Sequence, residues 1–211
     1  MGDPAPRRIA GIVLAAGAST RLGRPKQLLG LGGQPVIAHV VERTLAASLD
    51  EVLVVTGGAA GAVEEALSAY PVRIVPNPAY REGQSTSLIA GLDALADRAV
   101  DGVVVLLGDQ PGVDSADIAA LVERRRETHA PVVMTAYGRQ RSHPLLFGRE
   151  LFPELMAVRG DRGGRDVIRA HAPDVATVAS VFAEPPLDID TEEAYRALVA
   201  MWPSGGESIS P

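Results

Sequence analysis

The fold is decided by the stretch "IAGIVLAAGASTRLGRPKQLL", residues 9–29. Its first seven residues, 9–15, form a nearly continuous apolar run. A strand needs such a run when helices cover both faces of its sheet, as in parallel sheets. The run stops at Gly17, with small residues on either side. We therefore predict a buried strand over 9–15 that ends in a tight glycine turn.

Short apolar runs alternate with helical patterns along most of the chain. Further strands are predicted at 51–58, 72–77, 102–112 and 131–137. Helices are predicted at 35–48, 62–70, 85–98, 115–129 and 191–201, with Asp114 or Ser115 as the cap of the fourth. This alternation is typical of a three-layer α/β, Rossmann-like fold with a mostly parallel sheet and right-handed crossovers. After Tyr137 it breaks, and the segments 143–148, 159–166 and 176–182 are interpreted as an inserted region of strands and loops.

Length and composition fit one globular domain. The chain has 211 residues, 46% of them hydrophobic, and no Ser/Pro/Gly-rich linker divides its middle. A chain of this length can bury most of its apolar surface in a single core. We expect one domain over 1–211, with an ordered core at about 8–202 and frayed ends.

Charge and residue content exclude several classes of function. A net charge of −6 and only 4% aromatic residues disfavour nucleic acid as a partner. The absence of cysteine excludes thiolate catalysis and cysteine-bound zinc. The sequence has neither a signal-peptide pattern nor an apolar run of membrane-spanning length, so we expect no membrane partner and a cytoplasmic location. Small molecules are the expected substrates.

Three cations, Arg21, Arg24 and Lys26, lie within six residues shortly after the first strand. Their spacing from the glycines fits neither a Walker A loop nor the G-x-G-x-x-G dinucleotide fingerprint. Small residues at 15–20 still allow backbone N–H groups to approach an anion, at the strand end where ligands bind in such sheets. Arg21 and Lys26 would then neutralise phosphate charge. The alternative is a tight turn with solvated charges.

Two aspartates each have a chemical and a structural interpretation. Asp109, in "LLGDQPG", follows a buried strand and is either a Mg²⁺ ligand at the sheet edge or a turn former. Asp190 precedes Glu193 by three residues, which is the spacing of a helix capping box. Read alone, Asp190 is expected to cap the last helix.

The segment "LAAGASTRLGRPKQLL" matches L-A-A-G-x-S-x-R-[LM]-G-x-x-K and so resembles the MobA-like NTP transferases. Its A-A-G form is similar to the molybdenum cofactor cytidylyltransferase branch. The resemblance implies the nucleotide-diphospho-sugar transferase type of fold. It also implies that the residues of the loop surround the base and ribose, and that two of its cations act in catalysis by holding the triphosphate. The loop residues are Leu14, Ala15, Ala16 and Gly17, and the cations are Arg21 and Lys26.

Three further motifs carry the resemblance along the chain. "GDQP" implies Asp109 as a catalytic, nucleotide-binding and metal-binding residue. "DIDT" followed by an acidic residue implies Asp190 as a second metal ligand, with Asp188 a weaker candidate. "NPAYREGQSTSL" matches N-P-x-[WY]-x-x-G-x-x-x-S-L and implies that Asn77, Gly83 and Ser87 read the base. By themselves, Gly83 and the serines after it are a helix cap whose free N–H groups form a polar rim.

The acceptor side is implied by "SHPLLF" and "RGDRGGRDVI", which resemble G-H-P-x-x-F and G-D-x-G-x-R. Ser142 stands where the family usually has glycine. The resemblance implies that His143, Asp161, Gly163 and Arg165 bind the acceptor, with Arg165 on its phosphate. By itself, a histidine before proline is a loop residue, and the glycine-rich segment is a surface turn before a helix.

Together these motifs imply a Mg²⁺-dependent transfer of CMP from CTP to a phosphate-bearing acceptor such as molybdopterin, with release of pyrophosphate. Two alternatives stay open. One is an NAD(P)H-dependent oxidoreductase on the same scaffold, similar to the reductase of a nicotine-derived pigment. The other is a non-catalytic, nucleotide-binding maturation factor with a molybdoenzyme as its partner.

Overall fold

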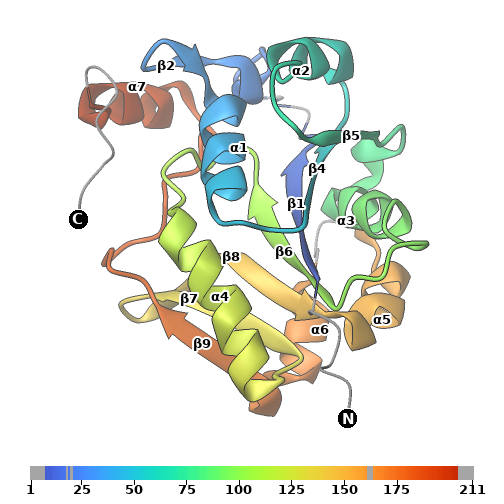
Figure 1. Cartoon of the computed structure of the whole chain (residues 1–211). Helices are drawn as coiled ribbons and strands as arrows, with labels where there is room; N and C mark the ends of the chain where they lie inside the picture. Colours follow the sequence, from blue (N-terminus) through green and yellow to red (C-terminus); the bar gives the residue numbers. More distant parts are fainter. Residues whose placement is uncertain (1–7, 18, 20, 161–163, 204–211) are drawn as a thin grey trace.

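The computed structural model describes residues 8–17, 19, 21–160 and 164–203 (Figure 1). Seven strands form one sheet in the order β5-β4-β1-β6-β8-β7-β9. These strands are β1 (Ile9–Ala15), β4 (Glu51–Thr56), β5 (Arg73–Pro76), β6 (Gly102–Leu107), β7 (Val132–Tyr137), β8 (Gln140–Gly148) and β9 (Val175–Ala179). A separate hairpin consists of β2 (Gly30–Leu31) and β3 (Gln34–Pro35). The helices are α1 (Val36–Ala46), α2 (Ala60–Ala66), α3 (Gln84–Asp93), α4 (Ser115–Thr128), α5 (Phe152–Ala157), α6 (Arg165–Ala170) and α7 (Glu192–Met201).

The sheet is mostly parallel, as predicted. β5, β4, β1 and β6 run parallel to one another, and β9 runs parallel to β7. β8 is antiparallel to both of its neighbours, β6 and β7. This reversal lies where the alternation of the sequence breaks after Tyr137.

β1 is buried on both faces, which explains its nearly continuous apolar run. Ile9 and Val13 belong to the core that includes α1, α2 and α4. Ala10 and Ile12 belong to the core that includes α3, α5 and α6. In Figure 1, α1 and α4 lie in front of the sheet. The two cores confirm the predicted three-layer α/β fold.

A third, smaller core joins the C-terminal part of the described chain to the hairpin. Ile189 and Leu198 pack against Leu29 and Leu31, with Val36 of α1 completing the cluster. The hydroxyl of Tyr195 in α7 donates a hydrogen bond of 2.6 Å to the carbonyl of Gly30. Figure 1 shows α7 beside β2. The segment before α7 is therefore held close to the loop that follows β1.

Several predicted boundaries differ from the structure. The helices predicted at 62–70 and 85–98 end earlier, at Ala66 and Asp93, and turns follow them. The strand predicted at 176–182 is β9, which ends at Ala179. Asp114 caps α4, because its Oδ1 accepts a 2.8 Å hydrogen bond from the Ala116 N–H. The predicted frayed ends lie mostly outside the described residues. Within the described ranges, no helix is long and apolar enough to cross a membrane.

The strand order reverses beside β1. From β1 the chain adds β4 and β5 on one side and then returns to place β6 on the other side. The carboxyl ends of β1 and β6 therefore flank the point where ligands bind in open α/β sheets. The predicted glycine turn follows β1 at this point, and Asp109 follows β6 at the same point.

Close packing of α3 on β1 depends on Gly91. A Cβ atom at Gly91 would lie 2.8 Å from Cγ2 of the buried Ile12, whereas a Cβ atom at Gly61 in α2 would meet open space. A Gly→Ala change gains up to about 1 kcal/mol of helix propensity in a helix interior, and less at Gly61 in the first turn of α2. Overpacking opposes that gain only at Gly91, so we predict that G91A is less stable than G61A by about 1–3 kcal/mol. Urea denaturation measures both free energies of unfolding, and equal values would contradict this packing.

Candidate active site

Hydrogen bonds from residues within the loop hold the loop after β1 in its folded shape. Nε2 of the buried Gln27 donates hydrogen bonds to the carbonyls of Ala15 at 2.9 Å and Gly17 at 3.5 Å. The Ser19 hydroxyl accepts a 3.0 Å hydrogen bond from the Lys26 N–H. These contacts fold the loop back on itself and fix where the Lys26 side chain begins. The sequence prediction did not include Gln27, for which a polar residue beside an apolar pair was the only signal.

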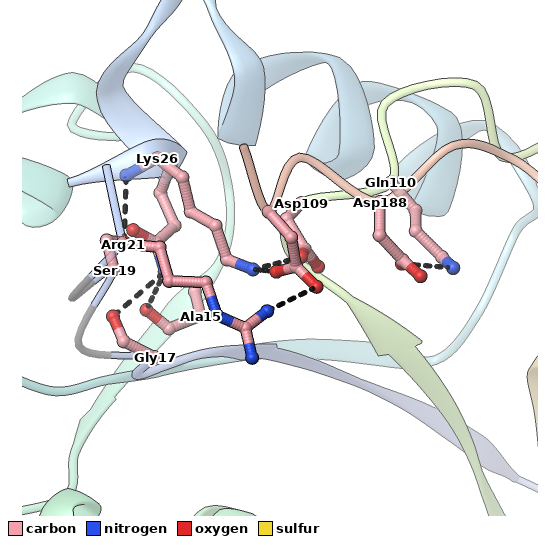
Figure 2. Close-up of polar contacts among 10 residues, drawn as sticks. Ala15, Gly17, Ser19, Arg21, Lys26, Asp109, Gln110 and Asp188 are labelled. Atoms are coloured by element: carbon pink, nitrogen blue, oxygen red, sulfur yellow. Dashed lines mark hydrogen bonds and ion pairs between the residues drawn. The ribbon is translucent and has the colours of Figure 1, made fainter. Parts of the chain in front are cut away.

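Lys26 connects the loop to two other parts of the chain. Its ammonium donates to the carboxylate of Asp109, just after β6, and to Oδ1 of Asp190 at 2.8 Å, just before α7. Figure 2 shows the Lys26 side chain extended toward Asp109. Burial opposes the charged form, but Asp109 and Asp190 outweigh it, so the pKa of Lys26 is raised. The ammonium therefore keeps its charge between the two carboxylates.

The three cations of the loop are not equivalent. Arg21 reaches toward the cluster in Figure 2, with its Nη1 3.9 Å from Oδ2 of Asp190 and 76% of its side chain exposed. Arg24 instead pairs with Glu192 of α7 at 3.0 Å and lies over the ring of Tyr195. The structure thus brings Arg21 and Lys26 to one site and holds Arg24 elsewhere.

Asp190 does not cap α7, contrary to the expectation from its spacing to Glu193. The cap is Thr191, whose hydroxyl accepts a 3.1 Å hydrogen bond from the Ala194 N–H. Since Thr191 satisfies the helix end, the Asp190 carboxylate is available for Lys26 and Arg21. The hydrogen bond from Lys26 and the charges of Lys26 and Arg21 lower the pKa of Asp190, against a smaller opposing effect of burial.

Asp188 lies apart from the ion pair. Its Oδ1 accepts a 2.7 Å hydrogen bond from Nε2 of Gln110, a buried residue next to Asp109 (Figure 2). Burial and repulsion from Asp109 and Asp190 raise the pKa of Asp188, while the Gln110 hydrogen bond acts in the opposite direction. The sequence prediction did not include the partnership with Gln110.

The carboxylate oxygens around Lys26 are of the kind that hard divalent metals prefer. Asp109 and Asp190 approach one cationic atom from two chain segments, so their oxygens already face a common point. In the described ranges, no group of three His, Asp or Glu side chains is arranged to hold a metal ion. Mg²⁺ is commonly bound by one or two carboxylates together with water and substrate phosphates. Two carboxylates of this kind fit a divalent metal ion whose remaining ligands are water and phosphate oxygens.

A cavity of about 690 Å³ opens beside this cluster, at the ends of β1 and β6. The predicted residues on its wall are Leu14, Ala16, Gly17, Lys26, Gly83, Ser87, Asp109, Asp188 and Asp190. Ala15, Arg21 and Asn77 are not on that wall. Tyr80 and Arg81 line the cavity as well, and Arg81 was absent from the sequence prediction.

Asn77 supports the wall from behind. Its Nδ2 donates hydrogen bonds to the hydroxyls of Thr86 at 2.9 Å and Ser87 at 3.0 Å, and its Oδ1 accepts from the Ala79 N–H at 3.0 Å. Both amide hydrogens of this buried residue are used inside the protein, so Asn77 shapes the segment before α3. Gly83 is the N-cap of that helix, as in the structural alternative, and no side-chain hydrogen bond accompanies this cap.

A second cavity, of about 580 Å³, adjoins the first and contains the described part of the predicted acceptor side. His143 and Arg165 line it, whereas Asp161 and Gly163 lie outside the described residues. Leu14, Gln84, Leu107 and Asp188 line both cavities, so the two spaces meet beside Asp188. Burial and the charge of Arg165 lower the pKa of His143 to about 4, so its imidazole is neutral at pH 7.

Sequence comparisons place this arrangement among known proteins. The family profile of the MobA-like NTP transferase domain matches residues 11–175. A nicotine blue oxidoreductase from Paenarthrobacter nicotinovorans is 33% identical over 208 residues, which cover 94% of this chain and 100% of that protein. The purine catabolism protein PucB from Bacillus subtilis is 28% identical over 200 residues, which cover 89% of this chain and 94% of PucB.

Solved structures agree with the fold. The crystal structure of Rv0371c from Mycobacterium tuberculosis H37Rv has a TM-score of 0.84 and 32% identity, covering 92% of this chain and 98% of that one. A complex of Rv0371c with manganese has a TM-score of 0.79 and 31% identity, covering 92% and 99%. A nucleotidyl transferase from Methanothermobacter has a TM-score of 0.78 and 29% identity, covering 92% and 96%. These matches confirm the nucleotidyltransferase type of α/β fold.

The lowered pKa of Asp190 gives a pH-dependent stability. A depressed carboxyl pKa stabilises the fold above the unfolded value of about 3.9, and this stabilisation is lost as the pH falls through the folded value. We predict that Asp190→Asn lowers the free energy of unfolding at pH 7 in metal-free buffer, and that its difference from the wild type disappears well below pH 4. Denaturant titrations across this range measure the effect.

Asp97→Asn is the matched control for that prediction. Asp97 is exposed and forms no ion pair among the described residues. Its variant should follow the wild type at every pH. A destabilisation by Asp190→Asn that persists unchanged at acidic pH would contradict the ion-pair origin.

Proposed function

The chain belongs to the MobA-like NTP transferase family, and on this premise we propose that it is a Mg²⁺-dependent nucleotidyltransferase. Acting as one domain over 1–211, it moves CMP from CTP onto a phosphate-bearing acceptor such as molybdopterin and releases pyrophosphate. One observation carries the proposal: the Lys26 ammonium lies between Asp109 and Asp190 at the reversal of strand order, where two cavities meet.

The first cavity, beside Lys26, is the proposed site of the nucleotide donor and is called the donor cavity below. It has the charge balance that a triphosphate needs. When a triphosphate binds, Lys26 and Arg21 would exchange their carboxylate partners for phosphate oxygens. Lys26 would act as a point charge and Arg21 through its planar guanidinium. Asp109 and Asp190 would hold Mg²⁺, which when bound neutralises charge on the triphosphate. Ala16 and Gly17 keep side-chain bulk away from the nucleotide, and Asn77 holds Ser87 in place on the same wall.

The second cavity, lined by His143 and Arg165, is the proposed site of the acceptor and is called the acceptor cavity below. The acceptor bound there provides the attacking oxygen. A phosphomonoester is already anionic near neutral pH, so its oxygen can attack the α-phosphorus without a general base. The new O–P bond forms as the bond to pyrophosphate breaks, and the two electrons of that bond leave with pyrophosphate. Arg165 would hold the acceptor phosphate, and His143 would contact the acceptor as a neutral imidazole. Catalysis then depends on alignment and on neutralisation of charge.

CTP is the proposed donor because of the sequence Ala15-Ala16-Gly17, which is similar to the cytidylyltransferase branch. Asp161 and Gly163 are proposed as further acceptor-binding residues on the same resemblance. A molybdoenzyme is the proposed partner that receives the product.

Lys26 and Arg24 form a matched pair for testing the site. We predict that Lys26→Gln lowers kcat/KM for CTP by about 10²–10³-fold, as expected when a group that stabilises developing charge is removed. Arg24→Gln should retain activity within a few-fold, because Arg24 is paired with Glu192 outside the donor cavity. Release of pyrophosphate from CTP with molybdopterin as acceptor, with and without Mg²⁺, is the measurement.

Three outcomes would contradict this assignment. Absence of turnover with every NTP and this acceptor would remove the transferase function. Equal rates in Lys26→Gln and Arg24→Gln would remove the role of the central ammonium. Full activity of Asp109→Asn, with Asp97→Asn as its control, would remove the metal role.

The 33% identity with nicotine blue oxidoreductase over its whole length favours a second candidate, an NAD(P)H-dependent oxidoreductase. The two functions differ in their dependence on the site, because hydride transfer does not require a metal between Asp109 and Asp190. If this candidate is correct, NADH or NADPH raises Tm and the nicotinamide absorbance falls on addition of an oxidised acceptor, without Mg²⁺. A transferase is instead stabilised by CTP with Mg²⁺. Binding of CTP without turnover would favour the maturation factor.

A further inference from the structure

The strand that carries His143 contains an irregularity beside the acceptor cavity. Met134 of β7 pairs with Leu145 of β8, but the next residue, Thr135, pairs with Ser142. His143 and Pro144 therefore have no partner residue in β7. The pairing of β8 with β6 also stops at Leu145, so the bulge lies beyond the last paired residue of β6. Bulges are frequent beside active sites, where they redirect a side chain.

Two buried hydroxyls of β7 satisfy the backbone of this bulge. Oγ1 of Thr135 donates a 2.7 Å hydrogen bond to the carbonyl of Pro144, and the hydroxyl of Tyr137 donates one of 3.1 Å to the carbonyl of His143. Thr135 and Tyr137 are almost completely buried. A buried carbonyl that has lost its strand partner needs another donor, so each hydroxyl replaces a missing ladder hydrogen bond.

A buried acidic residue lies behind Tyr137. Asp117 of α4 accepts a 2.8 Å hydrogen bond from the Ser180 hydroxyl and lies close enough to Tyr137 to affect its ionisation. Burial, together with the charge of Asp117 and a hydrogen bond to it, raises the pKa of Tyr137. The phenol therefore keeps its proton at physiological pH, and the His143 carbonyl lies within hydrogen-bond distance of it at 3.1 Å.

We propose that Thr135 and Tyr137 are positioning residues, which hold the bulge so that the imidazole of His143 faces the acceptor cavity and contacts the acceptor. The role of His143 as acceptor contact rests on the proposed function, whereas the support of the bulge does not. Neither hydroxyl is on the wall of the cavity, so both act only through the backbone of His143 and Pro144.

Variants that remove only the hydroxyls test this proposal. In Thr135→Val and Tyr137→Phe we expect KM for the acceptor to rise about tenfold, the effect of losing one buried hydrogen bond. KM for CTP should stay within about twofold, because the donor cavity is lined by other segments. Thr44→Val is the matched control: Thr44 is also fully buried, and its hydroxyl donates to the Val40 carbonyl in α1.

The test also separates action through His143 from a general loss of structure. In a His143→Ala background, Thr135→Val should no longer change KM for the acceptor, because the side chain that it positions is absent. An equal effect of Thr135→Val in both backgrounds would overturn the proposal. Two other results would overturn it as well. One is a change in KM for CTP as large as the change in KM for the acceptor. The other is an acceptor KM in Thr135→Val and Tyr137→Phe equal to that in Thr44→Val.

A spectroscopic readout keeps the proposal testable without turnover. Histidine NMR spectra, with the His143 signal identified by its loss in His143→Gln, should show a ring that does not titrate between pH 5 and 8. The charged groups lining its cavity are Arg141, Arg165, Arg169 and Asp188. In Thr135→Val and Tyr137→Phe the pKa of His143 should rise toward the ordinary value of about 6.5. An unchanged pKa of His143 in both variants would overturn the proposal, even if the protein transfers nucleotides. The predicted rise of this pKa would support the positioning role, even if the protein does not transfer nucleotides.

Discussion

The contact of Lys26 with Asp109 and Asp190 is the interaction on which the arrangement of the site depends. It joins the loop after β1, the turn after β6 and the segment before α7, which come from the beginning, the middle and the end of the described chain. The Lys26 side chain is 15% exposed and that of Asp109 is 12% exposed, so solvent screens the contact between these two residues only weakly. The Asp190 side chain is 54% exposed, so its contact with Lys26 is screened more strongly. Removing the ammonium would leave two carboxylates facing each other across the carboxyl end of the sheet.

The fold explains why these three segments meet. The reversal of strand order brings the ends of β1 and β6 together, and the small core of Leu29, Leu31, Ile189 and Leu198 brings Asp190 to the same edge. On the other side of Asp188 the β8 bulge faces the second cavity. The two cavities thus differ in how they are built: one has a closed loop and ion pairs, and the other has a strand irregularity held by buried hydroxyls.

The sequence predicted the elements that depend on local pattern. The apolar run at 9–15, the alternation of strands and helices and the position of Asp109 after a strand were sufficient for the fold and for part of the site. Contacts between distant segments were not predictable from one sequence. Read alone, the local spacing of Asp190 to Glu193 indicated a cap, and only the family resemblance assigned Asp190 to the metal site. Its pairing with Lys26 depends on the packing of α7. Gln27, Gln110 and Thr135 act through backbone or side-chain partners that only the folded chain brings close.

Relatives of this chain include a protein named as an oxidoreductase and a structure named as a nucleotidyl transferase, so the fold alone does not fix the reaction. We propose that the carboxylates around Lys26 bind a metal ion when a nucleotide phosphate pairs with the Lys26 ammonium. Calorimetric titration of the protein with CTP, in Mg²⁺ and in chelator, tests it most directly. We expect CTP to bind at least about tenfold more tightly with Mg²⁺, a coupling of about 1.4 kcal/mol between metal and nucleotide. Equal affinity in both buffers, or no binding of CTP in either, would contradict it.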